Sequence, residues 1–219
     1  TIVERNGEKI GIIGIVISRK TKMSSNPDDT TMFLDEVTTA QKYADELKSQ
    51  GVDQVILLSH YGYENDLALA QNTSGIDIIV GGDSHSLLGD LSDLGLKPSG
   101  SYPTMVNDAS GNDVCVVTAW QYSQILGELH AEFDDKGNIT SCIGTPHMML
   151  ADSFKRKNSD GERVEIEEGY RDAVYSVIKV NPSLSIVEPD ADAQALLAGY
   201  SSKIDEFSSK IIGSVSEDL

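Results

Sequence analysis

The chain has 219 residues, of which 39% are hydrophobic and 24% are charged, a composition that provides one full globular core. Its 35 Asp and Glu residues outnumber 17 Lys and Arg residues and give a formal net charge of -18. Such a charge excludes a nucleic-acid duplex as an expected partner, because affinity for a duplex depends on Lys and Arg at the phosphates. No apolar run approaches the roughly 20 residues that cross a bilayer, so we expect no membrane span. The chain starts at Thr1, directly on a strand-like stretch and without a basic-then-apolar leader, so we expect the native N-terminus to be missing.

The first elements are predicted to be a strand ribbon and a helix. Residues 10–17 form an apolar, β-branched run that Asn6-Gly7 separates from Ile2-Val3, which predicts an antiparallel ribbon. A polar loop is expected around residues 24–27. Apolar residues then recur three and four apart over 33–47, which predicts a helix. Its expected N-terminal caps are Asp29, Thr30 or Thr31.

Two short apolar runs, residues 55–58 and 76–80, predict buried strands with a short helix between them. Continuous apolar strands that alternate with helices favour a parallel or mixed sheet covered on both faces. In such sheets ligands bind beyond the carboxyl ends of the strands. His60 and the stretch Asp83-Ser84-His85 are expected at this edge.

The rest of the chain changes to a strand-rich pattern and ends in helices. Strands are predicted over residues 114–119, 125–133 and 139–149, and a hairpin over 155–164. Two further helices are predicted, one around 170–177 and one over 193–211, with a break at Asn181-Pro182-Ser183.

His60, Asp83 and His85 are the candidate metal ligands. Each histidine follows an apolar strand and is preceded by serine, and adjacent strands lie about 4.8 Å apart. Two imidazoles and a carboxylate suit Zn, Mn, Fe or Mg. A single histidine beyond a strand is more often an ordinary loop residue, but two of them with a carboxylate favour a metal site. His130 and His147 are interpreted as ordinary strand residues.

Gly82-Asp83-Ser84 also resembles the nucleophile block of GDS-type serine esterases, in which Ser84 would attack the ester. These enzymes take their base from an Asp-x-x-His motif, and the chain contains none. The esterase hypothesis is therefore the weaker one.

Cys115 and Cys142 lie on different predicted strands. Their number does not decide between two buried thiols and one disulfide. Export to an oxidising compartment would favour the disulfide.

Residues 55–66 and 76–85 resemble the second half of the calcineurin-like metallophosphoesterase domain of bacterial 5′-nucleotidases. The similarity extends through 119–122 and 127–129 and is strongest to the branch of periplasmic UDP-sugar hydrolases and NAD nucleotidases. It implies an α/β fold, the C-terminal half of a metallophosphoesterase β-sandwich flanked by helices and followed by a long connector helix. The implied divisions are a partial metallophosphoesterase domain (1–182), a connector helix (183–212) and the start of a C-terminal substrate-binding domain (213–219).

The resemblance also implies the chemistry of the parent protein. In that family two divalent metal ions, Zn, Mn or similar, hold a bridging hydroxide that attacks the phosphorus of a small nucleotide phosphate. UDP-sugars and NAD are candidate substrates. By position, His60 and Asp83 would bind one metal ion and His85 the other. The family more often has histidine where Asp83 stands, which leaves the metal preference open.

Other parts of the family pattern are absent from this chain. The earlier Asp-x-His, Gly-Asp-x-x-x-Gly and Gly-Asn-His motifs are missing, and with them the bridging aspartate and the catalytic histidine. We therefore expect no catalytic residue here and little or no turnover by the fragment alone. Its expected partners are the missing N-terminal half-domain and C-terminal domain, and the implied location is periplasmic or secreted. The alternative is a non-catalytic binding module that retains metal-like residues.

Overall fold

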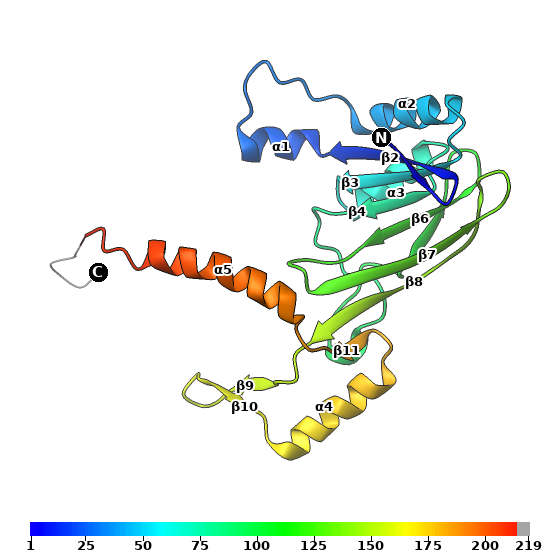
Figure 1. Cartoon of the computed structure of the whole chain (residues 1–219). Coiled ribbons are helices and arrows are strands. Elements are labelled where there is room, and N and C mark those ends of the chain that lie inside the picture. The colour runs from blue at the N-terminus through cyan, green and yellow to red at the C-terminus, as the bar shows by residue number, and fades with distance from the viewer. Residues whose placement is uncertain (214–219) are drawn as a thin grey trace. The chain divides into compact units, whose positions relative to one another are not determined.

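The computed structural model describes residues 1–213 and confirms an α/β fold (Figure 1). The chain forms two compact units. The first comprises residues 1–149 and 167–185, and the second comprises 150–166 together with the chain from 186 onward. The predicted division into 1–182, 183–212 and 213–219 stays a prediction, and all of its last segment except Gly213 lies outside the described residues.

A six-stranded mixed sheet forms the centre of the first unit. Its strands follow the order β1-β2-β3-β4-β6-β5. Strands β2, β3, β4 and β6 are parallel, whereas β1 and β5 pair antiparallel at the two edges. The bounds are β1 (Ile2–Arg5), β2 (Glu8–Val16), β3 (Gln54–His60), β4 (Ile78–Gly81), β5 (Thr104–Asn107) and β6 (Asp113–Thr118). The predicted ribbon and the parallel centre of the sheet are therefore confirmed.

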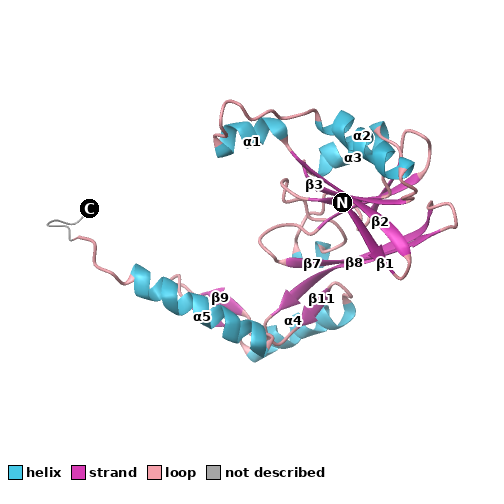
Figure 2. Ribbon diagram, turned by 45° about the horizontal axis from the view of Figure 1, so that its top comes forward, coloured by secondary structure: helices cyan, strands magenta, loops and turns pink. Residues whose placement is uncertain are grey.

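Helices α2 (Glu36–Ser49) and α3 (Tyr63–Asn72) cover one face of this sheet (Figure 2). Alternate strand residues such as Val55, Leu57 and Ile79 are buried against them. Ala40 and Leu69 are fully buried on the helical side. The apolar spacing that predicted α2 thus marks the side of the helix that packs in the core.

Two predictions near the start of the chain are wrong. Helix α2 begins at Glu36, and its cap is Asp35, whose side chain accepts a hydrogen bond from Thr38 N at 2.8 Å. Asp29, Thr30 and Thr31 lie before it, where Thr30 instead bonds the side chain of Asp28. The expected polar loop at 24–25 belongs to an additional helix, α1 (Ser18–Ser25). Helix α1 buries no residue, so its sequence carries no apolar period that could have predicted it.

A second sheet has the order β11-β8-β7. Its strands are β7 (Ile125–Phe133), β8 (Ile139–Leu150) and the short β11 (Leu184–Ile186). Strands β7 and β8 form the predicted hairpin, in which Asp134 N donates to Asn138 O at 2.9 Å. A disulfide joins Cys115 of β6 to Cys142 of β8, with Cα atoms 6.6 Å apart. This bond ties the second sheet to the first and decides between the two alternatives for the cysteines.

The prediction that both faces of the first sheet are covered is only partly correct. The pairings Leu58 with Val80 and Ile78 with Cys115 place these side chains on the face that carries the disulfide. Leu58 is nevertheless 48% exposed and Val80 40%. Within the described chain the second sheet therefore covers only the β6 side, and an apolar area over β3 and β4 stays bare. We call Leu58 and Val80 the bare face.

Helix α4 (Glu168–Val180) completes the first unit and confirms the predicted helix around 170–177. The chain between β4 and β5 contains one short 3-10 helix, η1 (Ser92–Leu94).

The second unit contains the hairpin of β9 (Lys155–Lys157) and β10 (Arg163–Glu165), as predicted, and helix α5 (Ala191–Ser208). The predicted connector helix over 183–212 is longer than α5 at both ends. It begins only at Ala191 because Asp190 caps it, accepting from Ala193 N at 2.8 Å, and β11 occupies 184–186. None of the helices within residues 1–213 combines the length and apolarity that a membrane span requires.

Candidate metal centre

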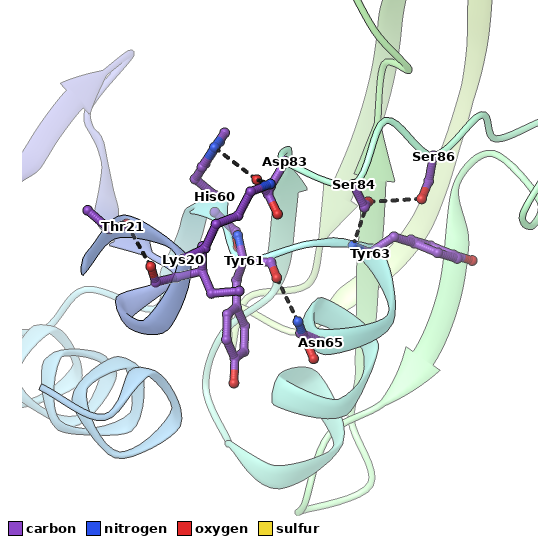
Figure 3. Close-up of polar contacts among 11 residues, drawn as sticks. Lys20, Thr21, His60, Tyr61, Tyr63, Asn65, Asp83, Ser84 and Ser86 are labelled. Atoms are coloured by element: carbon purple, nitrogen blue, oxygen red, sulfur yellow. Dashed lines mark hydrogen bonds and ion pairs between the residues drawn. The ribbon is translucent and has the colours of Figure 1, made fainter. Parts of the chain in front are cut away.

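Two of the three predicted ligands lie together at the carboxyl ends of neighbouring strands (Figure 3). His60 is the last residue of β3, and Asp83 follows β4 by two residues. His60 Nε2 lies 3.3 Å from Asp83 Oδ1. The chain segments that carry His60 and Asp83 therefore lie side by side, which follows from the parallel pairing of β3 with β4.

A lysine that the sequence did not indicate also reaches this pair. Lys20 of α1 forms an ion pair with Asp83 through the same Oδ1 atom. The Asp83 side chain is 11% exposed, whereas that of His60 is 60% exposed. Lys20 is 63 residues from Asp83 in the chain and belongs to the helix that the sequence did not predict, so no local signal marked it.

The third predicted ligand, His85, contacts a different residue. Its ring packs against Tyr122 in an edge-on arrangement, with centroids 5.1 Å apart and planes at 63°. Among the residues that the structure describes, no group of three or more His, Cys, Asp or Glu side chains is placed to hold a metal ion. The structure thus brings together His60 and Asp83, and the assignment of His85 as a ligand stays a prediction.

Backbone strain is concentrated in two loops around these residues. Asp83 (φ +72°) and His85 (φ +51°) have left-handed backbone conformations. So do Trp120 (φ +59°), Tyr122 (φ +50°) and Ser123, in the loop that follows β6. Such conformations cost about 1–3 kcal/mol each and cluster at functional sites. We therefore include the loop after β6 in the candidate site. The sequence could have indicated it, because this loop follows a third parallel strand, just as His60 and Asp83 lie at the ends of β3 and β4.

Gly81 and Gly82 are explained by close packing. A Cβ atom on Gly82 would lie 3.3 Å from both His60 Nδ1 and Ser59 O. On Gly81 it would lie 2.5 Å from Asp66 Oδ2. Both glycines let the end of β4 approach its neighbours, so neither requires a phosphate-binding role.

Ser84, the nucleophile of the esterase hypothesis, has structural partners. Its Oγ accepts a hydrogen bond from Tyr63 N at 3.0 Å, at the start of α3, and lies 2.9 Å from Ser86 Oγ. Neither partner is a base that could take the hydroxyl proton. This arrangement gives the esterase hypothesis no support.

His130 and His147 meet at a carboxylate on the surface of the second sheet. Glu128 Oε1 lies 2.8 Å from His130 Nε2, and Oε2 lies 2.7 Å from His147 Nε2. Hydrogen bonds from His147 and then His130 lower the pKa of Glu128 below its usual value. This agrees with the interpretation of both histidines as strand residues.

The donor atoms at His60 and Asp83 suit a divalent cation. Imidazole nitrogen and carboxylate oxygen are both ligands of Zn and Mn. The Lys20 ammonium shows that a positive charge is accommodated at Asp83 Oδ1. Two donors are half of the four that a tetrahedral zinc site uses, so the described residues provide part of a site.

Three comparisons place the chain among known proteins. It is 38% identical over 215 residues to a probable 5′-nucleotidase of Treponema pallidum, covering 97% of this chain and 36% of that protein. Its structure is similar to the NAD nucleotidase of Haemophilus influenzae (TM-score 0.89, 36% identity), covering 97% of this chain and 43% of that one. A 5′-nucleotidase precursor of Thermus thermophilus gives a TM-score of 0.72 at 32% identity, with 97% and 35% covered. No family model matches the chain.

Proposed function

Because the chain is homologous to a segment of the 5′-nucleotidases, we propose that it is part of a metal-dependent nucleotide phosphohydrolase. The observation that carries this proposal is the 3.3 Å approach of His60 Nε2 to Asp83 Oδ1 at the ends of adjacent parallel strands. His60, Asp83 and His85 are the proposed metal ligands. The proposed substrates are small nucleotide phosphates, with UDP-sugars and NAD as candidates.

The chain's own residues would act by holding the ions in place. His60 and Asp83 would share one of two divalent ions, and His85 would bind the other. When bound, such ions polarise phosphoryl oxygens and lower the pKa of a coordinated water. Lys20 pairs with Asp83 and would have to release that oxygen to an incoming ion.

The remaining ligands are proposed to come from another part of the parent protein. The chain spans 36% of the Treponema relative and 35% of the Thermus structure. We assign the bare face to contact with an N-terminal half-domain of the parent protein. Leu58 lies two residues before His60 on the same face of β3, so a domain that covered the bare face would lie beside the metal ligands. A periplasmic or secreted location belongs to the same proposal, and the disulfide supports it.

Metal binding by this chain tests the ligand assignment. Isothermal titration with Zn²⁺ or Mn²⁺ should detect binding to the wild-type chain, and His60→Ala, Asp83→Ala or His85→Ala should abolish it. His130→Ala is the matched control, because this exposed histidine pairs with Glu128 elsewhere. Equal binding by wild type and all three ligand variants would favour the rival hypothesis of a module without a metal site.

Complementation tests the enzymatic part. The isolated chain is expected neither to release phosphate from AMP nor to cleave the pyrophosphate bond of a UDP-sugar or NAD, because three ligands do not hold two ions in catalytic geometry. Addition of the N-terminal half-domain of the parent protein should restore hydrolysis, and Leu58→Glu on the bare face should prevent it. Efficient hydrolysis by the pure chain would contradict the proposal.

A further inference from the structure

We propose that Asp66 is a positioning residue for the candidate metal centre. Its buried carboxyl group contacts the ends of both β3 and β4 and thereby fixes His60 relative to Gly82 and Asp83. The expected effect on metal affinity rests on the proposed function. The effect on the conformation of His60 does not, since it is a property of the fold.

Asp66 is fully buried, although it is an acidic residue on a surface helix. It lies in α3 and has no exposed surface. Its Oδ1 atom accepts a hydrogen bond from Ser59 Oγ at 2.5 Å. Its Oδ2 atom is the only buried side-chain polar atom of the described residues without a hydrogen-bond partner. Burial raises the pKa of Asp66 to about 6, and no cation is among the causes of that shift.

The two carboxyl oxygens meet two different strands. Ser59 belongs to β3, and its Oγ also accepts from Tyr61 N at 3.1 Å, so the serine holds the backbone immediately after His60. On the other side, Oδ2 lies over Gly81 of β4, so close that a Cβ atom there would be 2.5 Å away. One side chain of α3 therefore sets the spacing of two neighbouring strand ends.

These contacts lie one residue before His60 and two residues before Asp83. Ser59 immediately precedes His60. Gly81 immediately precedes Gly82, on which a Cβ would lie 3.3 Å from His60 Nδ1. A shift of either strand end would therefore change how the His60 ring lies against the loop that carries Asp83.

A role in stability alone does not explain this arrangement. Burying a carboxyl group with an unsatisfied oxygen is unfavourable, and an apolar side chain would fill the same place at lower cost. Each unsatisfied buried group in a native fold requires a specific reason. The contacts of Asp66 with the ends of both β3 and β4 provide such a reason, since residues that orient metal ligands from behind are commonly polar and buried.

Asp77 offers a matched control at the opposite ends of the same strands. Its Oδ2 accepts a hydrogen bond from Val55 N at 2.7 Å and so joins the start of β4 to the start of β3. Burial also raises the pKa of Asp77 to about 6. Asp66 is fully buried and Asp77 half-buried, and the two carboxyl groups differ in which strand ends they join.

The experiment compares the two positions in the full chain. His60 imidazole and Gly82 amide NMR signals are measured without metal, Zn²⁺ affinity by titration, and unfolding by urea. Asp66→Ala should shift both signals and weaken Zn²⁺ binding about tenfold, the usual range for a residue that orients a ligand. Asp66→Asn should restore the wild-type signals, because its amide oxygen still accepts from Ser59. Asp77→Ala should lower stability and leave the signals unchanged.

Two outcomes would overturn the inference. The first is that the His60 and Gly82 NMR signals stay unchanged in Asp66→Ala. The second is that Asp77→Ala shifts these two signals as much as Asp66→Ala does. If Asp66→Ala does not fold, Ser59→Ala is used instead, because it removes only the contact of Asp66 with β3. The same two NMR signals are then measured. If the wild-type chain binds no Zn²⁺, the ligand assignment fails, while the two NMR signals still decide the role of Asp66.

Discussion

His60 Nε2 lies 3.3 Å from Asp83 Oδ1, and this distance follows from the order of the strands. β3 and β4 are neighbours and run in parallel, so residues just beyond their ends meet at one edge of the sheet. The approach also requires Gly82, since a side chain there would press on His60. Strand order and one small residue together produce the pair on which the candidate site rests.

Gly81→Ala tests the close packing of Asp66 on β4. The new methyl group would lie 2.5 Å from Asp66 Oδ2 and 3.5 Å from the backbone oxygen of Val117. We expect the free energy of unfolding to fall by about 1–3 kcal/mol, as for other overpacked sites. Gly14→Ala is the control, because Gly14 lies in β2 of the same sheet and a Cβ there meets nothing within 4 Å. Urea unfolding of both variants measures the difference, and equal effects would show that Oδ2 does not restrict Gly81.

Asp77→Asn tests the half-buried carboxyl group at the other end of the strands. Burial raises the pKa of Asp77 from 3.8 to about 6, so between these values the folded state binds more protons than the unfolded state. Stability from this group is therefore complete below about pH 4 and declines as the pH rises to 6. Asp77→Asn lacks this decline, so the free energy of unfolding of the variant, relative to that of wild type, should rise by about 2 kcal/mol from pH 4 to pH 6. Urea titrations at both pH values check this, and a constant difference would contradict it.

The disulfide between Cys115 and Cys142 should contribute measurably to stability. The bond closes a chain segment with a sequence separation of 27, for which the loop-entropy relation gives about 3.5 kcal/mol. Reduction by dithiothreitol should lower the free energy of unfolding by an amount of this order. The double variant Cys115→Ala, Cys142→Ala should be similarly destabilised and no longer respond to the reductant. A wild-type chain that is equally stable with and without reductant would contradict the prediction.

The order of the elements could be predicted from the sequence where apolar periodicity was strong. The parallel centre of the sheet and α2 were predicted because their apolar side chains face the core, whereas the β7–β8 hairpin was predicted from the Asp and Gly residues of its connector, 134–138. Helix α1 was missed because it buries no residue. The start of α2 was misplaced because several polar residues precede it, and only the structure shows that Asp35 is the one whose side chain caps the helix.

The candidate site could be predicted only where it depends on the order of the strands. His60 and Asp83 lie together because they follow neighbouring parallel strands, whereas the predicted convergence of all three ligands, with His85, stays a prediction. The contact between His85 and Tyr122 depends on the backbone conformation of two loops, which apolar patterns do not encode. Asp66 was not identified because its role comes from contacts with Ser59 and Gly81 on two different strands.

Lys20→Met tests whether the lysine competes with a metal ion. The Lys20 ammonium pairs with Asp83 Oδ1, the oxygen that also faces His60, so an ion that uses this oxygen must displace it. A partly exposed ion pair contributes at most about 1 kcal/mol, so its removal should strengthen Zn²⁺ or Mn²⁺ binding by about two- to fivefold. The gain should shrink at high salt, because screening weakens the pair in the wild-type chain. Lys22→Met removes an equal charge from the same helix, where Lys22 lies over the Phe33 ring, and should change the affinity less. Equal effects of the two variants would mean that only the general charge of α1 matters; weaker binding in Lys20→Met would mean that Lys20 supports the site instead of competing for it.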